Sequence, residues 1–355
     1  MFLTHGGDIY TALLAGKKPP LDFSTNINPL GMPRAAVRAL KKNAARFAAY
    51  PDPLCRRLRA ALSAHFDVPA EHIVCGAGAA DLIYRLVQQH KPDTALVVQP
   101  SFAEYEKALA EAGAAIDRFY LQPPAFELDD AILPQITANT GMIFLCNPNN
   151  PTGKLIRPEL VEAIAERCRE TKTLLVMDEC FLGLVTEGKA YSAVRLLDGH
   201  PSLVVLNAFT KTYALAGLRL GFAFFSDAAF AANVAAAGQS WPCSLAAEYA
   251  ALAALDDTAY LKKSHTLIQQ ERRRLSDGLS SLGLEVIGGA ANYLFLLCLL
   301  NKDIFFERLL ERGILIRDCA NYPSLEGGGY FRIAVKKPQE NIALLAALRS
   351  IAEER

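Results

Sequence analysis

Lys211 and Arg219 are the residues whose types and spacing first suggest chemistry. Both lie in the stretch 207–221, which follows a short apolar run at 203–206 that predicts a buried strand. An amine in partly apolar surroundings near a second cation has a lowered pKa, and its neutral form can attack a carbonyl carbon. An arginine supplies a bidentate fork for phosphate. Together they suggest pyridoxal phosphate, although a strand followed by a loop with two solvated cations would give the same pattern.

Two further motifs place polar residues directly after predicted strands. The sequence Asn-Pro-Asn-Asn-Pro-Thr-Gly at 147–153 fixes a rigid turn and leaves Asn150 as a short hydrogen-bonding side chain. Asp178 follows the apolar run 173–177. A carboxylate buried there needs a cation, such as a protonated pyridine nitrogen. An acidic helix N-cap is the alternative explanation of Asp178.

A glycine-rich turn and an aromatic residue extend the candidate site. The stretch 75–87 runs from a glycine-rich turn into a helix, and the backbone amides of Ala79 and Ala80 at the helix start can bind a phosphate dianion. Phe102 follows a predicted strand and could stack on a flat heteroaromatic ring. Both features also have ordinary explanations, because glycine often forms a turn before a helix and such an aromatic residue often belongs to the core.

Short apolar runs separated by helical stretches must position these residues. The runs at 95–98, 143–146, 173–177 and 203–206 are too short for helices and too continuous for half-exposed strands. Because they alternate with helical stretches such as 159–170, they predict a mostly parallel sheet covered on both faces. Ligands bind at the carboxyl ends of the strands in such sheets, and the candidate residues follow those ends.

The N-terminal part of the chain predicts a surface segment followed by helices. Residues 1–34 are rich in turn residues and can present backbone amides and short polar side chains to a ligand, although an ordinary N-terminal arm is the alternative. A helix is predicted at 33–45. Leucines at 54, 58 and 62 and a phenylalanine at 66 recur every four residues, which predicts a second, amphipathic helix.

A second domain is predicted to begin near residue 245. It should contain two helices, from 245 and over 260–282, with the charged run 271–274 on a solvated helix face. Three strands are predicted after them, at 293–298, 314–317 and 330–335. Arg317 and Arg332 lie in the last two strands, flanked by apolar residues. A bound carboxylate or phosphate would satisfy such arginines, and an internal ion pair is the competing explanation.

Composition excludes several classes of protein. The chain has 37 basic and 37 acidic residues and no basic block, which argues against nucleic acid or an anionic membrane as the main partner. No apolar run approaches the roughly 18 residues of a membrane span. The N-terminus lacks the pattern of a secretion signal, which predicts a cytosolic protein. The eight cysteines form no C-x-x-C pair and are expected to be reduced core residues, and the six histidines lack metal-ligand spacing, so no metal site is predicted.

In order and spacing, N-P-x-N-P-T-G, then M-D-E, then T-K-x-x-x-x-A-G-L-R-L-G resemble the fold-type I pyridoxal-phosphate enzymes of the aminotransferase superfamily. The resemblance covers essentially the whole chain. It implies an α/β fold with a large cofactor-binding domain at 46–245, built on a mostly parallel seven-stranded sheet. A smaller α+β domain would be formed by residues 1–45 and 246–355.

The resemblance also implies roles for the candidate residues. Lys211 would bond covalently to the cofactor aldehyde, Asp178 would pair with the pyridine nitrogen, Asn150 would bond the ring hydroxyl and Phe102 would stack on the ring. The cofactor phosphate would be held by the Ala79 and Ala80 amides, Thr210, Arg219, and Tyr50 from the second subunit of a homodimer. Two positions depart from the pattern: Phe181 replaces a common tyrosine, so one bond to the ring hydroxyl is absent, and Ala208 replaces a hydroxyl residue near the phosphate.

Within the superfamily the chain looks more like the threonine-phosphate decarboxylases than the histidinol-phosphate aminotransferases. The similar segments are T-H-G-G-D at 4–8, D-F-S-T-N-I-N-P-L-G at 22–31 and I-R-D-C-A-N-Y at 316–322. In the decarboxylases the residues that match His5, Gly6, Asn26, Asn150, Arg317 and Arg332 contact the substrate. The implied reaction releases CO2 from threonine phosphate and leaves an aminopropanol phosphate for the cobalamin side chain. Transamination of histidinol phosphate, decarboxylation of serine phosphate and a catalytically silent ligand-sensing domain are the alternatives.

Overall fold

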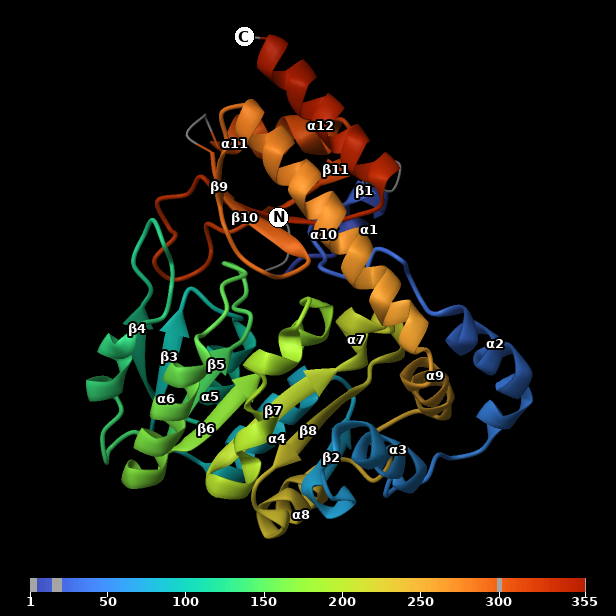
Figure 1. Ribbon diagram of the computed structural model, residues 1–355, viewed down its shortest axis with the longest axis vertical. Coiled ribbons are helices and arrows are strands. Elements are labelled where there is room, and N and C mark those ends of the chain that lie inside the picture. Colours follow the sequence, from blue (N-terminus) through green and yellow to red (C-terminus); the bar gives the residue numbers. More distant parts are fainter. Residues whose placement is uncertain (1–4, 15–20, 299–301, 355) are drawn as a thin grey trace.

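A seven-stranded sheet forms the lower part of the molecule in the computed structural model (Figure 1), which describes residues 5–14, 21–298 and 302–354. The strand order is β2-β8-β7-β6-β5-β3-β4. The sheet is parallel except for β8, which runs antiparallel to both of its neighbours. The mostly parallel sheet inferred from the sequence is therefore confirmed. Its strands are β2 Ile73–Gly76, β3 Thr94–Gln99, β4 Ala115–Tyr120, β5 Met142–Cys146, β6 Leu174–Asp178, β7 Leu203–Ala208 and β8 Gly221–Phe225.

Helices cover both faces of this sheet, which explains why its strands read as continuous apolar runs. In β3, Leu96 and Val98 join one core cluster, whereas Ala95 and Val97 join the other, because alternate side chains point to opposite faces. The first cluster includes residues of α3 Arg56–Phe66, α6 Pro158–Thr171 and α9 Leu245–Leu255. The second includes residues of α4 Ala79–His90, α5 Glu104–Glu111 and α8 Ala228–Ala236.

A four-stranded antiparallel sheet lies above the large sheet in Figure 1, with strand order β12-β13-β10-β9. The long helix α10 leads to it from the large sheet, and its strands and helices enclose a core of their own. The elements are α10 Thr258–Ser281, β9 Glu285–Ile287, β10 Tyr293–Leu297, α11 Lys302–Glu311, β12 Arg317–Asp318, β13 Tyr330–Ala334 and α12 Pro338–Glu353.

The N-terminal arm joins this upper part of the molecule. Its strand β1 Leu21–Asp22 pairs in parallel with β11 Ile314–Leu315, and Phe23 lies in the core of the upper part. The single strand predicted at 314–317 is therefore wrong: Ile316 separates β11 from β12, and the two strands belong to different sheets. The Leu21 and Phe23 backbone amides donate to the carbonyl oxygens of Gly313 and Leu315, so the arm pairs only with the first part of the predicted strand.

Shorter helices connect these parts of the fold. The α-helices are α1 Ile9–Leu14, α2 Arg34–Asn43 and α7 Phe209–Thr212. Helix α2 packs against α9, and Ala36 belongs to the first core cluster of the large sheet. The domain limits inferred at residues 46 and 245 stay a prediction. The short 3-10 helices are η1 Ala44–Ala48, η2 Ala70–His72, η3 Asp130–Gln135, η4 Leu182–Leu184, η5 Gly188–Tyr191, η6 Ala193–Gly199 and η7 Ala216–Leu218.

Two expectations about helix surfaces are wrong. Glu271, expected on a solvated face, is 2% exposed because α12 packs on α10 and Asn341 Nδ2 donates to the Glu271 carboxylate at 2.9 Å. Leu54 was expected to begin an amphipathic helix, but it is exposed and lies outside α3. The helix begins only at Arg56, because the backbone of Cys55 is left-handed. Among the helices of the described residues, none combines the length and apolar character needed to cross a bilayer.

Candidate active site

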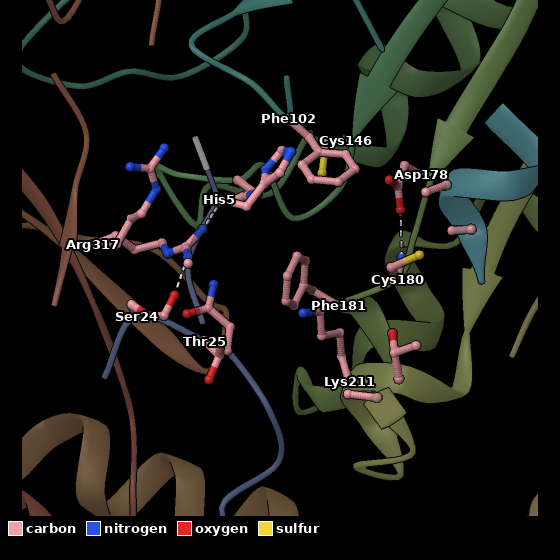
Figure 2. Close-up of a pocket in the computed structure, with 18 of the residues that line it drawn as sticks. His5, Ser24, Thr25, Phe102, Cys146, Asp178, Cys180, Phe181, Lys211 and Arg317 are labelled. Atoms are coloured by element: carbon pink, nitrogen blue, oxygen red, sulfur yellow. Dashed lines mark hydrogen bonds between the residues drawn. The ribbon is translucent and has the colours of Figure 1, made fainter. Parts of the chain in front are cut away.

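A cavity of about 250 Å³ lies where the carboxyl ends of the central strands meet the upper sheet (Figure 2). Lys211, Asp178 and Phe181 line one side of the cavity, and Arg317, Ser24 and Thr25 line the other. A larger cavity of about 590 Å³ contains none of the predicted site residues. The structure brings nearly all of the predicted residues together in the first cavity: His5, Gly6, Asn26, Ala79, Ala80, Phe102, Asn150, Asp178, Thr210, Lys211, Arg219, Arg317 and Arg332.

Tyr50 is the predicted residue that does not line this cavity. It is 78% exposed, and its ring stacks on that of Trp241 with 4.4 Å between the ring centroids. The resemblance assigns Tyr50 to the site of the second subunit in a homodimer. Its place on the surface of this chain therefore leaves that role a prediction.

Lys211 is half-buried on the short helix α7, which begins directly after β7. Burial lowers the pKa of Lys211 from 10.5 to about 8, and the nearby charges of Arg332 and Arg219 act in the same direction. This direction is the one that the sequence predicts. About one amine in ten is then neutral at pH 7, about 300-fold more than for an ordinary lysine. The Lys211 nitrogen lies 5.7 Å from the centre of the Phe181 ring.

Asp178 ends β6 and is 5% exposed. Its Oδ2 atom accepts a hydrogen bond of 2.6 Å from the Tyr105 hydroxyl, and its Oδ1 accepts one of 3.0 Å from the Cys180 backbone amide. None of the ion pairs among the described residues involves Asp178. Asp178 therefore presents a buried acceptor to the cavity that a cationic group of a ligand could complete.

The start of α4 and Arg219 lie together at the cavity and form a hollow whose chemistry suits an anion. No side chain caps α4, so the amides of its first turn, which include Ala79 and Ala80, face the cavity. The backbone of Gly78 has a φ of +98°, and a side-chain carbon there would lie 2.6 Å from Arg219 Nη2. Glycine is thus required to bring the guanidinium next to the helix start. This hollow fits a phosphate dianion, and Thr210 lines the same cavity.

Arg332 approaches the cavity from β13 of the upper sheet. It donates hydrogen bonds to Asn150 Oδ1 and to the Ser24 carbonyl oxygen, both of which are neutral. Its Nε atom is buried without a partner among the described residues. The internal ion pair considered from the sequence is therefore not the arrangement at Arg332, and the arginine keeps donor capacity for an anion. Because Asn150 Oδ1 is engaged, its Nδ2 amide is the group that can donate to a ligand.

Arg317 stands next to Arg332 on the neighbouring strand β12, because the two residues face each other in the β12–β13 register. Its guanidinium donates to Asn321 Oδ1 at 2.6 Å and lies 5.1 Å from the centre of the Tyr322 ring. The two arginines give this side of the cavity a positive charge that suits a doubly anionic ligand.

The N-terminal arm lines part of the cavity with His5, Gly6 and Asn26. His5 Nε2 and Glu104 Oε1 are 2.6 Å apart, and the Tyr84 hydroxyl donates to the other oxygen of Glu104 at 2.8 Å. Gly6 passes so close to the Ser24 carbonyl that a side-chain carbon would overlap it. Asn26 is 1% exposed, and neither polar atom of its side chain has a hydrogen-bond partner in the described part of the chain. A buried side-chain amide without partners can form hydrogen bonds to a ligand.

Sequence reasoning missed several residues of the site. Ser24 and Thr25 line the cavity, and the polar run Ser-Thr-Asn after Phe23 was the available signal. Cys146 and Cys180 also line it, and all eight cysteines are buried, as expected. Burial and the charge of Asp178 raise the pKa of both thiols, so they are neutral at pH 7. Of the remaining lining residues, Phe181 was recognised as a departure from the family pattern, whereas Ala216 and Tyr322 lie within quoted motifs but were given no role.

Comparison with known proteins places this geometry in a family. The family model for aminotransferase class I and II matches residues 18–348. The chain is 40% identical to a threonine-phosphate decarboxylase of Salmonella typhimurium, covering 98% of this chain and 96% of that protein. The crystal structure of the histidinol-phosphate aminotransferase from Clostridium acetobutylicum matches with a TM-score of 0.88 and 29% identity, covering 94% of this chain and all of that one. The structure of L-threonine-O-3-phosphate decarboxylase from Porphyromonas gingivalis matches with a TM-score of 0.81 and 25% identity, covering 94% and 99%.

Proposed function

The chain belongs to the aminotransferase class I and II family, and we propose that it is a pyridoxal-phosphate-dependent decarboxylase of L-threonine O-3-phosphate. The products would be CO2 and (R)-1-aminopropan-2-yl phosphate, a precursor for the cobalamin side chain. One observation carries the proposal: two separate anion-binding groups flank a single amine of lowered pKa. Ala79, Ala80 and Arg219 on the one hand, and Arg317 and Arg332 on the other, line the same cavity as Lys211.

The residues present fit the cofactor. The Ala79 and Ala80 amides with Arg219 would hold its phosphate, since the absence of a side chain at Gly78 leaves room for the guanidinium next to the helix start. Asp178 would pair with the pyridine nitrogen, and Asn150 Nδ2 would donate to the ring hydroxyl. Phe102, which lines the cavity, would stack on the ring. When bound, pyridoxal phosphate supplies an electron sink for bonds at the substrate Cα.

Substrate-binding residues would decide which bond at Cα breaks. Decarboxylation requires the bond from Cα to the carboxylate to stand perpendicular to the cofactor ring. A firm hold on the distal phosphate by His5, Gly6, Asn26 and Arg317 would rotate the substrate into that position. Arg332 would take the carboxylate, because its charge lowers the pKa of Lys211 more than any other charge does.

Arg332 would also time the final proton transfer. While the substrate carboxylate neutralises Arg332, its effect on the pKa of Lys211 is offset. When CO2 leaves, the guanidinium charge again lowers that pKa, so the Lys211 ammonium becomes a stronger acid. The electron pair left on Cα then takes a proton from Lys211 Nζ. The bond from Cα to the carboxylate carbon is thus replaced by a bond from Cα to hydrogen.

A direct assay separates this reaction from the main alternative. Purified protein with pyridoxal phosphate should release CO2 from threonine phosphate, and Lys211→Ala should release none. Histidinol-phosphate transamination is the second candidate, favoured by the high TM-score with the Clostridium acetobutylicum enzyme. Glutamate formed from histidinol phosphate and 2-oxoglutarate, without CO2 release from threonine phosphate, would replace the proposed function. Serine phosphate belongs in the same assay, because one methyl group changes specificity by only about 1–3 kcal/mol.

The protein is further proposed to be a cytosolic homodimer with shared active sites. Support for the dimer comes from Tyr50 and Trp241, a stacked aromatic pair that is 78% and 44% exposed. Aromatic residues are enriched at protein interfaces. Sedimentation analysis should give twice the chain mass. Tyr50→Ala should weaken binding of pyridoxal phosphate even though Tyr50 does not line the cavity of its own chain.

A further inference from the structure

Tyr105 is a fully buried residue of α5 that contacts the site without lining the cavity. Its hydroxyl donates to Asp178 Oδ2 at 2.6 Å. Its ring stacks almost parallel on Phe144, with 4.9 Å between centroids, and meets Phe102 edge-on at 5.6 Å. The phenol is therefore held in one orientation by aromatic packing on two sides.

The Asp178 carboxylate depends on neutral donors. Burial favours the protonated form of a carboxyl group, whereas hydrogen bonds to the anion favour the charged form. Among the described residues, the Tyr105 hydroxyl and the Cys180 backbone amide are the hydrogen-bond donors that hold this carboxylate. The Cys180 donor is a backbone amide in the turn after β6, so no substitution of a side chain removes it. The Tyr105 donor is a side chain of a separate helix, and a substitution can remove it.

We propose that Tyr105 is a positioning residue, which holds the Asp178 carboxylate in the orientation that would pair with the pyridine nitrogen of the cofactor. This inference rests on the proposed function. Burial and the charge of Asp178 raise the pKa of Tyr105 well above its ordinary value, so its hydroxyl remains a donor throughout the working pH range. Without this hydroxyl, Oδ2 of Asp178 would lose its hydrogen bond, and the carboxylate would no longer be fixed towards the pyridine nitrogen.

The chain offers a matched control for this contact. The Tyr84 hydroxyl also donates to a carboxylate, that of Glu104, at 2.8 Å. Neither residue lines the cavity, and the Glu104 carboxylate contacts His5. Tyr84→Phe removes the same chemical group from the same kind of bond. It should leave cofactor affinity unchanged.

The experiment compares Tyr105→Phe with wild-type protein in the absence and presence of pyridoxal phosphate labelled with 15N in its ring. The phenylalanine keeps both aromatic contacts. We expect cofactor affinity to fall about 10- to 100-fold, the usual effect of a lost hydrogen bond to a charged group. We also expect the 15N chemical shift to show loss of the ring proton at a lower pH. A purely structural role would instead lower the unfolding midpoint of the cofactor-free protein and leave the 15N titration unchanged, which would overturn the inference.

A double-mutant cycle tests whether the effect acts through Asp178. In an Asp178→Asn background, Tyr105→Phe should change cofactor affinity less than threefold, because the carboxylate it supports is gone. Equal losses in both backgrounds would overturn the inference. Wild-type protein that binds no pyridoxal phosphate would overturn the proposed function as well. Wild-type binding that Tyr105→Phe leaves intact would overturn the inference alone.

Discussion

Replacing Asn26 by leucine should stabilise the ligand-free protein while weakening substrate binding. Asn26 is 1% exposed, and both polar atoms of its side chain are buried without a partner among residues 5–14, 21–298 and 302–354. Each unsatisfied polar atom costs about 1–3 kcal/mol. Leucine is slightly larger than asparagine, and its packing strain offsets part of the gain. We expect the free energy of unfolding to rise by about 1–3 kcal/mol.

Asn28 provides the matched control two residues along the chain. It is 2% exposed, but its side chain donates to the Thr212 carbonyl and the Ser264 hydroxyl, both at 2.8 Å, and accepts from the Leu30 amide at 3.0 Å. Asn28→Leu breaks three hydrogen bonds and leaves their partners unsatisfied. The same substitution should therefore destabilise the protein at this position by about 3 kcal/mol or more.

Urea unfolding of the ligand-free variants measures these changes, since free energy falls linearly with denaturant. In parallel, Asn26→Leu should raise the KM for threonine phosphate about 10- to 100-fold, because hydrogen bonds to a charged ligand contribute about 1.5–3 kcal/mol. Binding of pyridoxal phosphate should be unchanged. An Asn26→Leu variant that is less stable than wild type and has an unchanged KM would refute the reasoning, because Asn26 would then be a structural residue.

Three other predictions address the lysine and the N-terminal arm. The rate at which cofactor-free protein captures pyridoxal phosphate should rise with pH up to about 8 and then level off, because the Lys211 pKa is lowered to about 8 and only the neutral amine reacts; a stopped-flow pH profile that levels off near pH 10 would contradict this. Gly6→Ala should raise the KM more than about tenfold by displacing the arm, whereas Gly199→Ala, where a side-chain carbon meets nothing within 4 Å, should leave steady-state kinetics unchanged. Glu104→Gln should raise the KM by no more than about fivefold, since the contact between Glu104 and His5 is partly exposed. A loss of cofactor affinity in this variant would contradict the prediction, because it would mean that Glu104 supports the cofactor site.

Features that depend on local sequence could be predicted from the chain alone. Continuous apolar runs identified the central strands because these strands are buried on both faces, and the residues that follow strand ends came together at one edge of the sheet, as Lys211, Asp178 and Asn150 do. The anion-binding start of α4 was recognisable from glycines directly before a helix.

Contacts between distant segments were not predictable from the sequence. Tyr105 and Asp178 are 73 positions apart, so their hydrogen bond depends on how α5 packs beside β6. Glu271 looked like part of a solvated charged run, yet Asn341 from another helix buries it. The strand at 314–317 divides because β1 pairs with its first half, and no local signal at Ile316 marks that division.

The fate of the substrate carboxylate tests the central claim most directly. Threonine phosphate labelled with 13C at its carboxyl carbon should be incubated with the protein and pyridoxal phosphate, and the label followed by NMR. The account predicts that the label moves into CO2 and bicarbonate at the rate at which aminopropanol phosphate forms, and that Lys211→Ala abolishes both signals. Label that remains in a 2-oxo acid, or in unreacted threonine phosphate under conditions where histidinol phosphate is transaminated, would contradict it.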